Sequence, residues 1–153
     1  MINEYAITFT LLTIYTIFLH LWSDLRELKV DSRRNYMMIG AVLVIGLISH
    51  QIETLIITGI LTIILTLILN YFEKKQGKVV FGDGDKEILN WSVPGIALSF
   101  GHYYSSLFIA LLMISFFSLA LLKKTNNITL NKLPGLIFIA LSYLVVLVFG
   151  WFL

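Results

Sequence analysis

Long apolar segments separated by short polar ones are the feature that most constrains how this chain can fold. None of these segments contains a formally charged residue. A transmembrane helix needs about 20 mostly apolar residues, and shorter helices are tolerated where neighbouring helices shelter them. We therefore predict about six transmembrane helices, at approximately Tyr5–Trp22, Tyr36–Ser49, Thr54–Phe72, Ile88–Phe100, Ser105–Leu122 and Pro134–Leu153.

The overall composition excludes an ordinary soluble domain. Hydrophobic residues make up 58% of the 153 residues and charged residues only 13%, whereas soluble domains are about half apolar and about a quarter charged. A small soluble fold has too much surface to hide this excess. The predicted fold class is therefore all-α, a polytopic membrane helix bundle formed as a single domain over residues 1–153.

The stretch from Ile88 to Leu122 is uncharged throughout and too long for one crossing. Gly101 provides a natural break, and Tyr103 and Tyr104 directly after it are typical of the interface between membrane and water. We therefore divide this stretch into a short fourth helix and a longer fifth helix.

The basic residues fall in three of the polar segments. If successive helices cross the membrane in alternate directions, these three segments share one face. The positive-inside rule makes that face cytoplasmic, so we expect both termini outside and a multi-pass location in the cell membrane. The eleven basic residues are Arg26, Lys29, Arg33, Arg34, Lys74, Lys75, Lys78, Lys86, Lys123, Lys124 and Lys132.

The chain has no cysteine. This excludes disulfide frameworks, thiol nucleophiles and zinc sites built from cysteine. The three histidines do not form a recognisable metal-ligand pattern. We predict no metal, no cofactor and no nucleic-acid partner, with membrane lipid as the surrounding medium.

Two acidic residues are predicted to meet at the cytoplasmic face. Asp24 follows the first apolar segment, and Asp85 precedes the fourth. Acidic residues at a membrane boundary are costly to desolvate and mark functional sites. Two carboxylates that share one proton can act together as a base toward water and an acid toward a carbonyl. This chemistry is that of an aspartic protease.

Asp85 ends the segment Gly82-Asp83-Gly84-Asp85, which has the pattern GxGD. We expect Gly82 and Gly84 to give the backbone positive φ angles and to let another backbone approach closely. The alternative is an ordinary turn in which Asp85 caps the helix that follows.

The segments Asp24–Val30 and Gly82–Lys86 resemble those of the type IV prepilin peptidase family, in its archaeal preflagellin (prearchaellin) peptidase branch. The six-helix layout of that family covers the whole chain. The GxGD motif is also shared with presenilin-like membrane proteases. Where many bacterial members have Ile-Pro-Asn, this chain has Val30-Asp31-Ser32, which favours the archaeal type. Without the cysteine-rich domain of bifunctional members, peptidase activity alone is expected.

The resemblance implies a membrane aspartic endopeptidase that removes the short basic leader from prepilin-like or archaellin-like precursors at the cytoplasmic face. The catalytic roles would fall on Asp24 and Asp85, supported by Gly82 and Gly84. Acidic residues on the same face are candidate contacts for the basic leader, although pairing with neighbouring basic side chains is the alternative. These candidates are Glu27, Asp31, Asp83 and Glu87.

The division of labour between the two acids follows from the helix dipole. Asp85 precedes a helix, where the dipole favours an anion, and Asp24 lies near a helix C-terminus, where it does not. We expect Asp85 to be the ionised base and Asp24 to hold the proton. His20, four residues before Asp24, is either a proton relay or a histidine hydrogen-bonded within the bundle.

Two other functions use the same residues. An ion- or proton-coupled transporter or channel would use the two carboxylates to bind a cation or pass protons. The predicted position of the acids at the boundary, and the lack of an inverted repeat, count against it. A non-catalytic assembly partner in a secretion or pilus system is the third interpretation.

Overall fold

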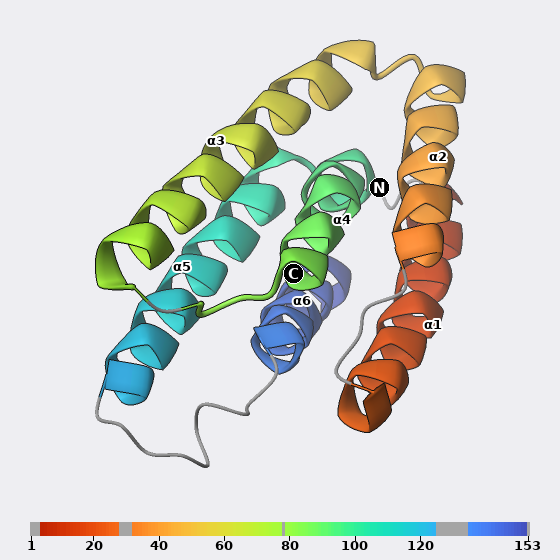
Figure 1. Cartoon of the computed structure of the whole chain (residues 1–153). Coiled ribbons are helices and arrows are strands. Elements are labelled where there is room, and N and C mark those ends of the chain that lie inside the picture. The colour runs from red at the N-terminus through yellow and green to blue at the C-terminus, as the bar shows by residue number, and fades with distance from the viewer. Residues whose placement is uncertain (1–3, 28–31, 78, 125–134, 153) are drawn as a thin grey trace.

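The chain folds into a bundle of helices (Figure 1). The computed structural model describes residues 4–27, 32–77, 79–124 and 135–152, and within these ranges it contains helices and no strand. The predicted all-α class is therefore confirmed. The helices are α1 (Glu4–Glu27), α2 (Ser32–Ile48), α3 (Ile52–Gln76), α4 (Asp83–Phe100), α5 (His102–Lys124) and α6 (Gly135–Phe152).

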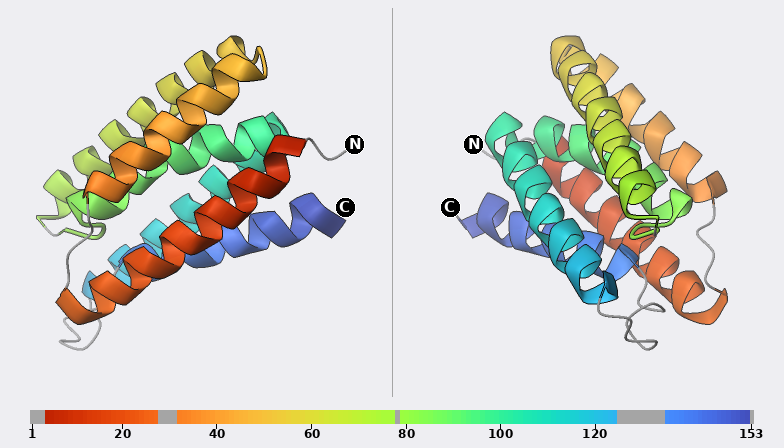
Figure 2. Two further views of the ribbon diagram at one scale, coloured as in Figure 1. Left: turned by 90° about the vertical axis from the view of Figure 1, so that its right-hand side faces the viewer. Right: turned by 60° about the vertical axis from the view of Figure 1, so that its left-hand side comes forward.

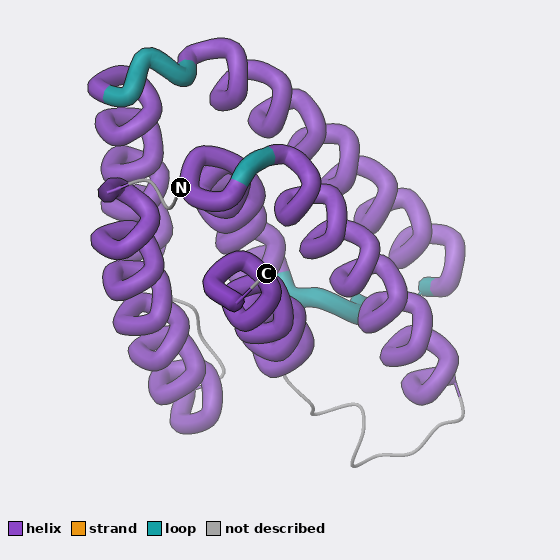
Figure 3. The backbone as a smooth tube through the Cα atoms, turned by 180° about the vertical axis from the view of Figure 1, so that it is seen from behind, coloured by secondary structure: helices purple, strands orange, loops and turns teal. Residues whose placement is uncertain are grey.

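Successive helices run in alternate directions. Figure 2 shows that α1 begins and α6 ends at the same end of the bundle, so both ends of the chain lie there. The C-terminal ends of α1, α3 and α5 and the N-terminal ends of α2, α4 and α6 lie at the opposite end. Figure 3 shows that the connections between α2 and α3 and between α4 and α5 are short loops.

Three helices are long and apolar enough to cross a membrane, which indicates a membrane protein. These segments are Ile52–Lys75, His102–Leu121 and Gly135–Phe152, and α1 contains a shorter apolar segment, Ile7–His20. Large apolar side chains of α3, among them Ile56, Ile63 and Leu67, are exposed on the outside of the bundle. Lipid is the solvent that suits such a surface.

Helix α4 lies at the centre of the bundle. It contacts each of the other five helices, and most of its residues are buried. A helix sheltered in this way does not need the length or the hydropathy of one that faces lipid. This explains why α4 combines polar residues such as Ser92 and Ser99 with a proline at position 94.

The start of α4 differs from the prediction. The helix begins at Asp83, not at about Ile88, because the charged residues before Ile88 form its first turn. Acidic side chains are favourable there, next to the positive end of the helix dipole. The expected positive φ angles at Gly82 and Gly84 are wrong: Gly82 has φ −64° and Gly84 is helical.

Positive φ angles occur instead where helices end, at His50 (φ 56°) after α2 and at two glycines. Gly77 (φ 65°) follows α3, and Gly101 (φ 96°) separates α4 from α5. Most residues avoid this region because of their Cβ atom. The predicted break at Gly101 is confirmed.

Glycine contacts fix how α6 and α1 lie against α4. A Cβ built on Gly135 would meet Asp85, and one built on Gly150 would meet Phe100. Both pairs are separated by 50 positions, so α4 and α6 run parallel in a constant register. A Cβ on Gly95 would overlap the ring of Phe9, which places the start of α1 against the middle of α4.

We expect Gly95→Ala to lower the free energy of unfolding by about 1–3 kcal/mol, the usual cost of forcing atoms into a packed core. Gly59 has nothing within 4 Å of a built Cβ, so Gly59→Ala should be neutral or stabilising, because alanine favours helix. Equilibrium unfolding of both variants in detergent micelles measures the difference. Equal effects of the two substitutions would contradict this packing.

Candidate functional site

Asp85 lies buried at the junction of α4 and α6. It is the third residue of α4, and its exposed fraction is 6%. Its Oδ2 accepts the backbone N–H of Gly82 at 3.0 Å, which satisfies a donor at the start of the helix. A Cβ on Gly135 would lie 2.5 Å from the same oxygen. The glycine that begins α6 therefore allows the helix to approach this carboxylate.

A buried ion pair fixes the turn before Asp85. The Nζ of Lys86 lies 2.5 Å from Oε2 of Glu73, and both side chains are only 8% exposed. Oε1 of Glu73 accepts the backbone N–H groups of Val80 and Phe81, each at 2.7 Å. One carboxylate thus joins the end of α3, the loop and the first turn of α4.

Lys86 has a further partner in Asn70, whose Oδ1 lies 2.7 Å from Nζ. Asp83 is more distant, at 3.8 Å from the same ammonium, and its side chain is fully exposed. A buried ion pair is tolerated when hydrogen bonds satisfy the remaining atoms of both groups. Glu73 and Lys86 meet this condition.

A second polar network links α2 to α4. Asn35 is fully buried; its Nδ2 donates to Oε2 of Glu87 at 3.2 Å, and its Oδ1 accepts from Nε1 of Trp91 at 3.0 Å. Since all these groups are side chains, the network fixes the orientation of α2 against α4. It occupies the turns of α4 that follow Asp85.

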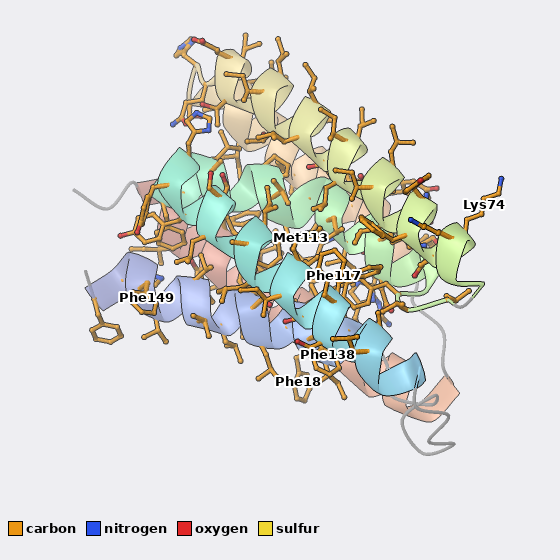
Figure 4. The ribbon with its side chains drawn as sticks, turned by 90° about the vertical axis from the view of Figure 1, so that its left-hand side faces the viewer. Phe18, Lys74, Met113, Phe117, Phe138 and Phe149 are labelled. Carbon is orange, nitrogen blue, oxygen red and sulfur yellow. The ribbon has the colours of Figure 1, made fainter. Side chains whose placement is uncertain are left out.

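A cavity of about 540 Å³ opens beside the start of α4. Gly82, which donates its N–H to Asp85, lies in its wall. Figure 4 shows Lys74, another wall residue, pointing away from the end of α3. The residues that line the cavity are Asn70, Glu73, Lys74, Gly77, Val79, Gly82, Asp83 and Lys86.

Asp24 lies in the last turn of α1, and its side chain is outside the described part of the structure. The end of α1 and the start of α4 lie at the same end of the bundle (Figures 1 and 2). Because α1 and α4 run antiparallel with Phe9 against Gly95, His20 is roughly level with the first turn of α4. Asp24 follows His20 by four residues, so it lies about 6 Å further along the axis of α1, past the level of the first turn of α4.

The structure describes the side chains of two of the four residues predicted to contact the leader. Glu27 ends α1, with its side chain outside the described part, and Asp31 lies outside the described residues altogether. Asp83 is exposed in the wall of the cavity. Glu87 is half-buried, and its carboxylate accepts a hydrogen bond from Asn35 that helps to hold α2 against α4.

Several residues of this end were not identified from the sequence. Glu73, Asn35 and Trp91 were not singled out as partners, because their contacts join different helices. One signal was available for Glu73, since an acidic residue directly after the apolar segment ending at Phe72 is costly to bury without a partner. Lys86 was expected to pair with neighbouring surface acids, but its shortest ionic contact is with Glu73.

No group of three or more histidine and acidic residues suited to a metal ion occurs within the described ranges.

No protein-family model, no curated protein and no solved structure matches this chain.

We expect Lys86→Met to lower the free energy of unfolding by about 3–5 kcal/mol, because it leaves the Glu73 carboxylate buried without its cation. Adding Glu73→Gln should restore part of the loss, since the unpaired charge is removed. Lys75→Met, at an exposed lysine of the same end, serves as the control. The ion pair has no such role if the two lysine variants unfold at the same denaturant concentration.

Proposed function

We propose that this protein is a membrane-embedded aspartic endopeptidase. The observation that carries the proposal is the burial of Asp85 in the first turn of α4, at the end of the bundle where α1 brings Asp24. Two carboxylates from separate helices, at the boundary between lipid and cytosol, suit the hydrolysis of a peptide bond by activated water.

Within this class, we propose a peptidase of the type IV prepilin and preflagellin kind. The support is the GxGD segment at residues 82–85 and the segment Asp24–Val30, which begins with the first of the two acids. The substrates would be prepilin-like or archaellin-like precursors, in which a short basic leader precedes a hydrophobic helix. Cleavage between these two parts takes place at a membrane surface, which is the environment of both acids.

The proposed topology has six crossings, with both termini outside and the acids facing the cytoplasm. Its support is the placement of basic residues: Arg33 and Arg34 begin α2, Lys74 and Lys75 end α3, and Lys86 lies in the first turn of α4. All lie at the end of the bundle opposite the chain termini, and the positive-inside rule assigns that end to the cytoplasm.

In the proposed mechanism, the ionised member of the pair takes a proton from water while the protonated member polarises the substrate carbonyl. Asp85 is favoured as the base because it lies near the positive end of the α4 dipole. Asp24 lies one helical turn beyond the level of Asp85, so the end of α1 must close toward α4 when substrate binds. Closure of this kind is common in enzymes that exclude bulk water.

In this proposal the leader of the precursor binds at the cavity beside Gly82, whose wall has two acidic residues, Glu73 and Asp83, and two basic ones, Lys74 and Lys86. The cavity lies next to Asp85. Its wall contains Asp83, an exposed carboxylate, and a basic leader can approach this carboxylate while both charged groups stay hydrated. Such exposed charges raise the rate of encounter more than the affinity. The leader would thus lie on the cytosolic side of Asp85 and the hydrophobic helix of the precursor on the lipid side.

We expect Asp85→Asn and Asp24→Asn each to reduce the rate of cleavage of a purified precursor by about 10³-fold or more. The reason is that two carboxylates that act as one catalytic unit lose most of their activity when either is replaced. The measurement is the rate of leader removal by the protein reconstituted in lipid vesicles. Glu53→Gln, an exposed carboxylate at the opposite end of the bundle, is the matched control and should cleave at the unaltered rate.

The same vesicles separate the proposal from transport. A protease leaves the internal pH of vesicles unchanged under an imposed cation or proton gradient, whereas a transporter dissipates the gradient through its carboxylates. Gradient dissipation that Asp85→Asn abolishes, without any cleavage by the unaltered protein, would overturn the peptidase assignment.

A further inference from the structure

Two consecutive residues at the start of α2 contact the two helices that carry the proposed catalytic acids. Arg34 is half-buried, and its Nη1 donates to the backbone carbonyl of Leu19 in α1 at 3.4 Å. Asn35 is fully buried and donates to Glu87 and accepts from Trp91, both in α4. The first turn of α2 therefore links the C-terminal part of α1 to the N-terminal half of α4.

The contact between Arg34 and Leu19 is compatible with a regular helix. A backbone carbonyl has two lone pairs, so that of Leu19 can accept from Arg34 in addition to an N–H of its own helix. The long side chain of an arginine packs its apolar part against other helices while its guanidinium stays near water. One turn deeper, Oγ1 of Thr16 lies 3.3 Å from Sδ of Met38 in α2, so α1 and α2 are in contact at two successive turns.

The position of Asp24 needs a fixed point closer than the far end of α1. The close contact of Phe9 with Gly95 holds α1 against α4, but Phe9 precedes Asp24 by about 22 Å along the helix axis. Over this length, a tilt of α1 by about 5° displaces Asp24 by about 2 Å. A misplacement of about 1 Å can cost about 10²-fold in rate. Leu19 lies only five residues before Asp24, so its contact with Arg34 limits this tilt.

We propose that Arg34 and Asn35, which we call the α2 bracket, are positioning residues for the acid pair. They set the distance between the end of α1, which carries Asp24, and the first turn of α4, which carries Asp85. The inference rests on the proposed function, because a fixed distance matters to two carboxylates that act on one water molecule. Neither residue of the α2 bracket lines the cavity assigned to the leader, so their role is separate from substrate binding.

Pulsed double electron–electron resonance between two spin labels measures the link without any catalysis. The chain has no cysteine, so labels attach only at introduced ones. Phe18→Cys and Asp83→Cys place them at exposed positions of α1 and α4, and Figure 4 shows Phe18 on the outer surface of the bundle. Adding Arg34→Met should shift and broaden the distribution of distances by about 1–2 Å, the displacement that a tilt of about 5° gives at Phe18.

Arg33→Met is the matched control, because it removes the same charge from the adjacent position, whose side chain is exposed. This variant should leave the distance distribution unchanged. Arg34→Lys keeps a charged donor on a long side chain and should restore most of the original distribution. If Arg34→Met has the distribution of the unaltered protein, the proposal is overturned, whether or not the protein cleaves a precursor.

The kinetics of precursor cleavage in lipid vesicles are the second readout. Arg34→Met should lower kcat by about 10²-fold and leave KM unchanged, and Arg34→Lys should recover most of the loss. A higher KM with an unchanged kcat would mean that Arg34 binds the substrate, which contradicts a positioning role. Absence of cleavage by the unaltered protein would remove the proposed function, while the spin-label distances would still decide whether the α2 bracket holds the two helices.

A double-mutant cycle tests whether Arg34 and Asn35 act through one link. Asn35→Leu removes the hydrogen bonds to Glu87 and Trp91 and should also lower kcat. Arg34→Met/Asn35→Leu should be no slower than the slower single variant, because either substitution already separates α1 from α4. Losses of kcat that multiply would mean that the two residues act independently, and would contradict the α2 bracket.

Discussion

The buried carboxylate of Glu73 is the interaction on which the charged end of the bundle depends. It accepts the backbone N–H groups of Val80 and Phe81 and holds the ammonium of Lys86. These contacts define the turn between α3 and α4, and therefore the position at which α4 begins. This turn, together with the contact of Gly135 with Asp85, sets the place of Asp85 beside α6. The proposed chemistry thus rests on an ion pair that takes no part in it.

The helical class and the approximate positions of the helices could be predicted, because apolar length is a property of each segment alone, although α1 and α3 end, and α2 begins, four or five residues outside the predicted segments. The start of α4 could not be predicted, since a search for uncharged apolar segments leaves out the charged residues that form the first turn of this helix. The partner of Lys86 could not be predicted either: Glu73 lies 13 positions away, and the two meet only through the turn. Asp85 was singled out from its motif, but its burial depends on Gly135 of α6, which no local pattern indicates.

Polar groups are distributed in the bundle according to what each costs to bury. Most charged groups of the described residues lie at one end, where Lys86 and Glu73 satisfy each other and Asp83 remains in solvent, and Glu53 lies exposed at the other. Neutral hydroxyls such as Thr13 and Ser92 lie deeper, where a charge would be far more costly. Helix α4 joins the two regions, since it carries Asp85 in its first turn and Ser92 two turns later. Its central position allows both to be surrounded by other helices.

The meeting of Asp24 and Asp85 is the central claim, and disulfide trapping tests it most directly because the chain has no cysteine of its own. A disulfide requires Cα atoms within about 7 Å of each other. With precursor bound, so that the end of α1 closes toward α4, Asp24→Cys/Asp85→Cys should be cross-linked by a mild oxidant in native membranes faster than Asp24→Cys/Asp83→Cys, because Asp85 faces the bundle and Asp83 faces solvent. Cross-linking of the 24–83 pair without any of the 24–85 pair would contradict the account.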